Sequence, residues 1–95
     1  MRFAKIDANQ TQVVESLRAA GATVQSLATI GNGCPDLLVG YRGVTVLLEV
    51  KDGRKVSSAQ KLTPDQEKWH SNWGGGILAV VNSPDAALKE LGIIK

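Results

Sequence analysis

The sequence predicts an α/β fold of the mixed α+β kind, in which a central four-stranded mixed sheet is accompanied by helices in the order α-β-β-β-α-β-α. Three observations predict it. Several segments begin with helix-capping residues and end at glycine, and two apolar runs flank a short glycine-containing connection typical of a β-hairpin. A helix separates the last two strands, which requires a parallel crossover. A chain of 95 residues has room for one core, so we expect a single domain over residues 1–95.

The first helix is predicted over about Gln10–Ala20. Asn9 is expected as its N-cap, with a capping-box glutamine three residues later, and Gly21 follows where a helix-ending glycine belongs. The segment Thr23–Ile30 is rich in β-branched and apolar residues and predicts a strand. Gly31–Pro35 has the composition of a loop.

Two apolar runs then predict the hairpin, Asp36–Val39 and Val44–Lys51, joined through Gly40–Gly43. The second run is apolar on both faces except near its end. This pattern indicates a central strand.

The remaining elements follow in the same way. Asp52–Lys61 is polar and basic and predicts a mobile loop. A second helix is expected to begin at the N-cap Thr63 and to run to about Trp73, before three consecutive glycines. Ile77–Val81 predicts a buried strand, and Ser83–Gly92 predicts the last helix.

Composition excludes several classes of protein. Eleven basic and nine acidic residues leave a formal net charge of +2, which is mild for a dedicated nucleic-acid binder. The single cysteine, Cys34, excludes an internal disulfide and a cysteine-rich zinc site. The longest apolar run, Ile77–Val81, is too short to span a membrane, and the polar N-terminus has no apolar signal region. We therefore expect a cytoplasmic protein without a membrane partner.

The chemistry-bearing residues lie at the open end of the predicted hairpin. If Arg42 and Gly43 are the two turn residues, Asp36 lies directly opposite Glu49, with their Cβ atoms about 5 Å apart. A three-residue loop with a bulge would shift the register by one, but the two carboxylates would still be neighbours. Lys51 shares the face of Glu49, because side chains two apart on a strand point the same way. Two carboxylates this close repel each other unless a cation neutralises them.

A divalent cation suits this arrangement better than a lysine alone. Carboxylate oxygens are ligands for Mg²⁺ or Mn²⁺, and an open site of this kind polarises a phosphate and lowers the pKa of a bound water. Lys51 beside it would orient the water and stabilise developing negative charge. The chemistry indicated is phosphodiester hydrolysis.

Taken separately, each motif has a plainer interpretation. A Glu-x-Lys at a strand end is often a solvated face with a weak ion pair, and Pro35-Asp36 is often only a turn. Together they cap the most apolar hairpin of the chain, where solvated charges are least expected. This placement favours the functional interpretation.

These residues resemble a known nuclease signature. Pro35-Asp36, twelve intervening residues and then Glu49-Val50-Lys51 resemble the PD-(D/E)xK motif, and the element order resembles the restriction-endonuclease-like core of that superfamily. Three blocks resemble small stand-alone VRR-NUC domains, which are typical of phages and prophages: Gly33–Gly40, Leu48–Gly53 and Leu62–Gln66. The resemblance covers about residues 7–88.

The resemblance implies a Mg²⁺- or Mn²⁺-dependent DNA endonuclease without an organic cofactor. It would act as a homodimer on structured or branched DNA, such as a Holliday junction or a flap, in a bacterial cell. Asp36 and Glu49 match metal ligands, and the backbone carbonyl of Val50 matches a third. Lys51 matches the catalytic lysine, and Gln66 matches a glutamine that supports the active site.

Members of the family often carry a further acidic residue at the first helix. Asp7, Gln10 and Glu15 are candidates here, and none of them matches clearly. On a helical wheel Glu15 points away from the apolar face. The number of metal ions per site is therefore left open.

A basic segment next to the motif is the candidate DNA contact. Lys51–Lys61 has a net charge of +3, and Arg54, Lys55 and Lys61 could lie along a phosphate backbone. Arg42 at the hairpin tip is a weaker candidate. A merely solvated loop is an equally good interpretation of these charges.

The aromatic and thiol side chains have structural interpretations. Trp69 and Trp73 are four apart on one helical face, which is more typical of a core or dimer contact than of base stacking. His70 is expected to be partly buried and structural, and Cys34 to be a small buried residue.

Two other classes of function remain open. One is a non-catalytic DNA-binding or assembly module that retains the nuclease fold. The other is a soluble structural or adaptor domain.

Overall fold

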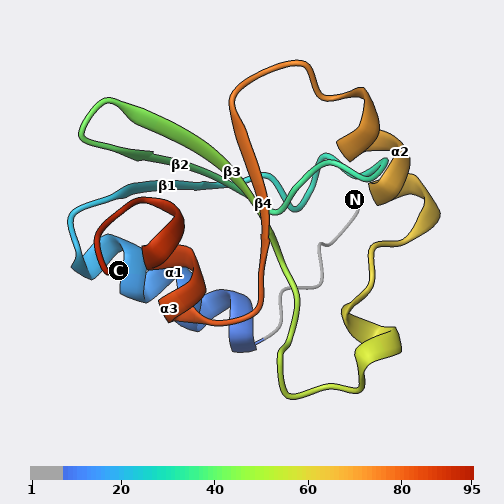
Figure 1. The fold of residues 1–95 in the computed structure, drawn as a ribbon, viewed down its shortest axis with the longest axis horizontal. Coiled ribbons are helices and arrows are strands. Elements are labelled where there is room, and N and C mark those ends of the chain that lie inside the picture. Colours follow the sequence, from blue (N-terminus) through green and yellow to red (C-terminus); the bar gives the residue numbers. More distant parts are fainter. Residues whose placement is uncertain (1–7) are drawn as a thin grey trace.

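The computed structural model describes residues 8–95 and has the predicted mixed α+β architecture (Figure 1). Its helices and strands follow in the expected order: α1 (Ala8–Ala19), β1 (Thr23–Ser26), β2 (Leu37–Tyr41), β3 (Val44–Val50), α2 (Pro64–Asn72), β4 (Ile77–Val81) and α3 (Pro84–Glu90). A 3₁₀ turn, η1 (Ser57–Gln60), lies in the segment expected to be only a loop.

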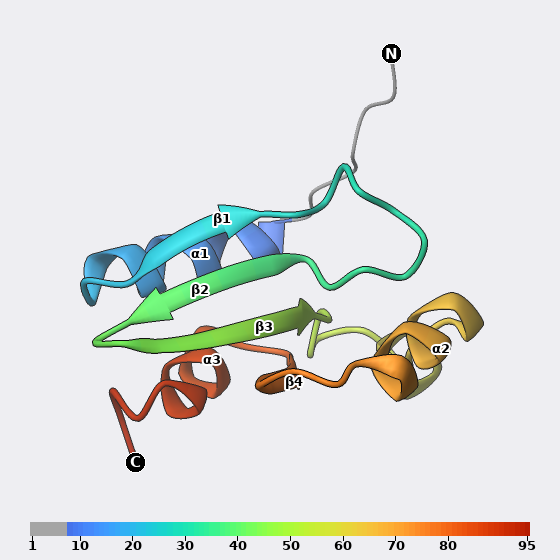
Figure 2. The ribbon, with the colours of Figure 1, turned by 90° about the horizontal axis from the view of Figure 1, so that it is seen from above.

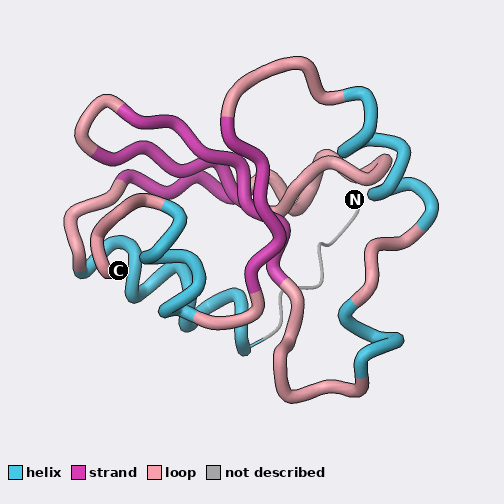
Figure 3. Tube along the Cα trace, in the orientation of Figure 1, coloured by secondary structure: helices cyan, strands magenta, loops and turns pink. Residues whose placement is uncertain are grey.

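The sheet has the order β1-β2-β3-β4 (Figure 3). β2 pairs antiparallel with β1 and β3, whereas β3 and β4 are parallel, as the intervening helix predicts. The hairpin register runs from Tyr41 opposite Val44 to Leu37 opposite Leu48, as the sequence predicts. Arg42 (φ 47°) and Gly43 (φ 82°) both adopt the left-handed conformation that a tight two-residue hairpin turn requires.

Helices α1 and α3 lie together on one face of the sheet and cover the core (Figures 1 and 2). The fully buried apolar side chains come from that face of the strands and from the two helices: Val13, Leu17, Leu37, Val39, Val46, Leu48 and Ala87. Alternation along β3 places Leu47 and Glu49 on the opposite face. Leu38 and Val80, also on that opposite face, remain 38% and 46% exposed.

Helix α2 lies beyond the carboxyl end of β3 instead of on the sheet (Figure 2). Thr63 caps it through both halves of a capping box, and Pro64 occupies its first turn, as predicted. None of its residues is buried. The sequence predicts a core or dimer contact for Trp69 and Trp73, and the core alternative is wrong, because α2 packs on loops and the indoles stay partly exposed. The dimer alternative stays a prediction.

Two further expectations need correction. Asn9 is not an N-cap, because it lies inside α1 and its side chain is buried against the end of β3. Cys34 is only partly buried. Within residues 8–95, no helix combines the length and the hydropathy that crossing a bilayer requires.

Candidate active site

Asp36 and Glu49 meet at the open end of the β2–β3 hairpin. Asp36 immediately precedes β2, and Leu37 pairs with Leu48, so the next position of the ladder brings Asp36 to Glu49. The backbone N–H of Val50 donates a hydrogen bond of 2.8 Å to Asp36 Oδ2 and holds that carboxylate against β3. The two carboxyl groups also share a hydrogen bond. The predicted acidic pair is thus assembled by the hairpin register.

The carboxyl group of Glu49 is buried and incompletely bonded. The residue is 2% exposed, and its Oε1 atom has no hydrogen-bond partner among the described residues. Burial, followed by the hydrogen bond and the negative charge of Asp36, raises the pKa of Glu49 to about 9, although Lys51 acts to lower it. Without a cation, Glu49 is therefore protonated at neutral pH.

Lys51 is held by the start of α2. Its Nζ atom donates a 2.8 Å hydrogen bond to Gln66 Oε1, and the same oxygen accepts the backbone N–H of Thr63 at 2.9 Å. Gln66 is therefore both the capping-box partner of Thr63 and a contact of Lys51. Because a capping box fixes the side chain of Gln66, it also fixes the direction in which Lys51 points.

Asn9 is a part of this site that sequence reasoning missed. Its Nδ2 atom donates to the carbonyl of Lys51 at 2.7 Å and to that of Asn82 at 3.5 Å, which joins the ends of β3 and β4. A signal was available, because Asn9 lies on the same helical stripe as Val13 and Leu17, at a spacing of four residues. A polar side chain on a buried stripe needs a partner.

The loop before Asp36 packs directly against α2. Gly33 has a φ of 83°, and a Cβ atom added there would overlap the carbonyl group of Asp65. Only glycine fits this conformation and this approach together. The contact positions the loop that carries Asp36 relative to the helix that carries Gln66.

Two further titratable side chains lie close to the site. Burial raises the pKa of the Cys34 thiol, and the charges of Glu49 and Asp36 raise it further. Burial lowers the pKa of His70, and the positive charge of Lys51 lowers it further. The Nε2 atom of His70 is buried without a partner in the described part of the chain. His70 is thus a neutral neighbour of Lys51.

The acidic pair fits a hard divalent cation. Residues 8–95 contain no cluster of three or more His, Cys, Asp and Glu side chains placed to hold a metal. The donor set is instead two carboxylates and the neighbouring backbone carbonyl of Val50, all oxygen, as Mg²⁺ and Mn²⁺ prefer. The unpaired Oε1 of Glu49 is the atom that such an ion would satisfy.

The candidate ligands at the first helix have different outcomes. Asp7 lies outside the described residues. Glu15 is exposed and does not join the pair, because residues 8–95 hold no cluster of three such side chains. Glu15 and the buried Gln10 line a groove beside Val24 and Ser26 of β1, and Ser26 pairs with Leu37, the residue after Asp36.

The basic residues predicted to contact DNA lie in three different environments. Arg54 forms an ion pair of 3.1 Å with Asp52, and its hydrogen bonds lower the pKa of that carboxyl. Lys55 and Lys61 are exposed in the same segment. Arg42 lies over the ring of Tyr41 at the closed end of the hairpin, which the length of β2 separates from the acidic pair by about 17 Å.

Comparison with known proteins gives one informative match. No family model matches the sequence, and no curated protein matches it significantly. Among solved structures, a chain described as a VRR_NUC domain matches with a TM-score of 0.66 and 32% sequence identity, over 90% of this chain and 92% of that one. Similarity at this identity over nearly the whole of both chains establishes the family. The protein belongs to the VRR-NUC family of nuclease domains and is a nuclease-type DNA-processing domain.

Proposed function

We propose that the protein is a Mg²⁺- or Mn²⁺-dependent endodeoxyribonuclease that acts on structured or branched DNA, of the Holliday-junction or flap type, as a homodimer. The observation that carries the proposal is the buried Glu49 beside Asp36. The pKa of Glu49 is raised to about 9, its Oε1 atom is unpaired among the described residues, and Lys51 nearby is held in one direction by Gln66. Carboxyl groups perturbed by burial and by a second carboxyl group are typical of functional sites, which supports the proposal.

Each residue of the site has a distinct task in this proposal. Asp36, Glu49 and the carbonyl of Val50 would hold the cation, which supplies charge to polarise the phosphate and to lower the pKa of water. Lys51, held by Gln66, orients the attacking water and stabilises the negative charge that develops on the phosphate. Gln66 is a positioning residue, because it acts through Lys51.

The exposed lysines would guide the DNA backbone to this pair. Lys55, Lys61 and Arg54 are all exposed, but Arg54 is paired with Asp52. A DNA phosphate would have to compete with the Asp52 carboxylate for Arg54, so we expect Lys55 and Lys61 to contribute more to binding than Arg54. Arg42 would contact only a duplex that extends along the hairpin.

A metal-dependent nicking assay tests the activity. With Mg²⁺ or Mn²⁺, the wild-type protein is expected to nick DNA, and both Glu49→Ala and Lys51→Ala are expected to lower the rate at least about 100-fold. Lys89→Ala, at an exposed position in the last turn of α3, is the matched control and should keep the wild-type rate. Unchanged cleavage by the two site variants would contradict the proposal. Salt-sensitive DNA binding without cleavage in any divalent metal would favour the non-catalytic module.

The substrate and the assembly are tested with one panel. Linear duplex, single-stranded, flap and four-way-junction DNA are incubated with each metal, and the same protein is sedimented at micromolar concentration. We expect faster cleavage of the branched forms and a dimeric mass, because cutting two strands requires two sites. Equal rates on all four forms would refute the preference for branched DNA. A fully active monomer would refute the homodimer.

A further inference from the structure

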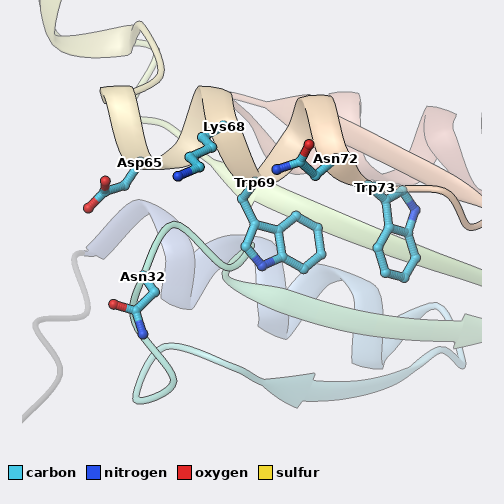
Figure 4. A pocket seen from close by; sticks show the side chains of 6 residues that line it. All are labelled: Asn32, Asp65, Lys68, Trp69, Asn72 and Trp73. Atoms are coloured by element: carbon cyan, nitrogen blue, oxygen red, sulfur yellow. The ribbon is translucent and has the colours of Figure 1, made fainter.

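An aromatic groove lies between α2 and the loop that carries Asn32 (Figure 4). Its volume is about 470 Å³, within the range of small-molecule sites. It is lined by Asn32, Asp65, Lys68, Trp69, Asn72 and Trp73. We infer that this groove binds one unpaired nucleobase of the DNA substrate by stacking on Trp69. The inference rests on the proposed function and adds the feature of DNA that this chain recognises.

The two indole rings form a preorganised platform. Trp69 and Trp73 stack with their centroids 5.1 Å apart and 15° between their planes. Trp73 Nε1 donates a 3.0 Å hydrogen bond to the carbonyl of Gly76, and the backbone of Gly75 lies against its ring, where a Cβ atom would not fit. One side of the stack is thus occupied. A platform fixed before binding loses little conformational entropy when a further ring is added.

The polar lining suits a neutral heterocycle better than a phosphate chain. The groove carries one cation, Lys68, and one anion, Asp65, so its formal charges cancel. Two amide side chains, Asn32 and Asn72, lie at either side of Trp69 (Figure 4). Amides offer both donors and acceptors, as the hydrogen-bonding edge of a base requires. Asn32 comes from the loop that leads to Asp36.

The position of the groove connects it to the cleavage site. Asp65, Trp69, Asn72 and Trp73 form one stripe of α2 at helical spacing, and the neighbouring stripe carries Gln66, which binds Lys51. Gln66 and Trp69 are three residues, or about 5 Å of helix, apart. A base on Trp69 would therefore belong to a nucleotide close to the phosphate that is cut. An unpaired base of this kind occurs at branch points and in single strands.

A second copy of the chain fits the groove less well. Interfaces between subunits bury about 800 Å² per partner around an apolar centre. Four of the six lining residues here are polar or charged, and the groove has room for a single small molecule. A dimer contact at the two tryptophans is nevertheless an outcome that the experiment detects.

Fluorescence tests the inference without metal and without cleavage. The chain has two tryptophans, so the variant Trp73→Phe leaves Trp69 as its sole indole. In EDTA, a decamer of thymidylate is titrated against an abasic decamer that has the same phosphates. We expect the thymidylate oligomer to quench Trp69 and to bind about fivefold or more tightly than the abasic one.

Variants of the otherwise wild-type chain give the matched comparison, with binding followed by anisotropy of labelled oligomers. Trp69→Leu should bind thymidylate as weakly as the abasic oligomer, Trp69→Phe should retain the preference, and Val44→Ala, at the far end of the hairpin, should behave as wild type. Thermal melting of each variant checks that it is folded. If Trp69→Leu does not fold, the comparison of Trp69→Phe with the wild type still tests the inference. Equal affinity for the two oligomers in the wild type would overturn the inference. A dimer that dissociates in Trp69→Leu, without base-dependent quenching, would assign the groove to subunit contact and overturn it equally.

The two proposals fail in different ways. Base-dependent quenching by a protein that cuts no DNA with any metal would contradict the nuclease proposal alone. Cleavage of branched DNA by a protein that shows no base-dependent quenching would contradict the stacking subsite alone.

Discussion

The substitution Glu49→Gln is expected to stabilise the metal-free protein at pH 8 while it abolishes cleavage. The pKa of Glu49 is raised to about 9 in the folded chain, from an ordinary value of 4.5. Between these two values the folded chain binds more protons than the unfolded chain, so stability falls as pH rises, by about 1.4 kcal/mol per pH unit. A neutral amide does not carry this penalty, and it can donate to Asp36 as the protonated acid does.

The expected size of this effect is large for a protein of this length. A gain of at least about 2 kcal/mol at pH 8 corresponds to a rise in Tm of roughly 10 °C. The difference between the variant and the wild type should shrink as the pH is lowered and disappear below pH 4.5, where the glutamate is protonated in both states. Thermal melts in EDTA at several pH values measure it.

Divalent metal is expected to reverse the order of the two Tm values, so that the wild type melts at a higher temperature than Glu49→Gln. In the proposed function, Mg²⁺ or Mn²⁺ would bind only the folded acidic pair, so it should raise the Tm of the wild type but not that of Glu49→Gln. Glu15→Gln, at an exposed carboxylate of α1, is the control and should melt like the wild type with and without metal. A pH-independent difference, or a less stable Glu49→Gln protein in EDTA at pH 8, would show that burial of the acidic pair does not oppose its ionisation.

The substitution Gly33→Ala is expected to cause a large loss of stability for the addition of a single methyl group. It places a Cβ atom on a residue with a φ of 83° and against the carbonyl of Asp65. The left-handed conformation alone costs about 1 to 2 kcal/mol for alanine. Relief of the overlap requires α2 to move as well, so we expect a total of about 3 kcal/mol and a strongly reduced nicking rate, since Gln66 moves with α2.

Gly43→Ala separates the two contributions. Gly43 has nearly the same φ, 82°, but nothing lies within 4 Å of an added Cβ atom. This variant should lose only the conformational part, and its nicking rate should stay at the wild-type level. Urea denaturation of the two variants gives the comparison. Equal losses of stability would mean that the contact between the Gly33 loop and α2 contributes nothing.

The register of the hairpin could be predicted because its determinants are local. A two-residue turn at Arg42 and Gly43 leaves one pairing that keeps the apolar residues of both strands on their faces, and that pairing puts Asp36 opposite Glu49. The caps at Thr63 and Ser83 were predictable for the same reason, since each cap depends on residues within three positions. These elements account for the agreement between the predicted and the observed order.

Contacts between distant segments were not predictable in the same way. The sequence around Asn9 predicts an N-cap. No neighbouring residue indicates that its side-chain amide donates a hydrogen bond to the Lys51 carbonyl, 42 residues away. The sequence indicates a core or dimer contact for the indoles of α2, because an apolar stripe does not show which surface it meets.

The sequence by itself indicated the family, through the resemblance of its motif blocks, and it also determined the strand pairing of the hairpin and the identity of the acidic pair with its lysine. The pairing was predictable because alternation and turn chemistry act over a few residues and depend little on the rest of the chain. Only the tertiary structure decided how deeply Glu49 is buried, that Gln66 holds Lys51, and that two tryptophans form a groove next to this pair. Burial and side-chain contacts between distant segments arise only when all the elements pack together. Such packing produces no local pattern in the sequence from which it could be predicted.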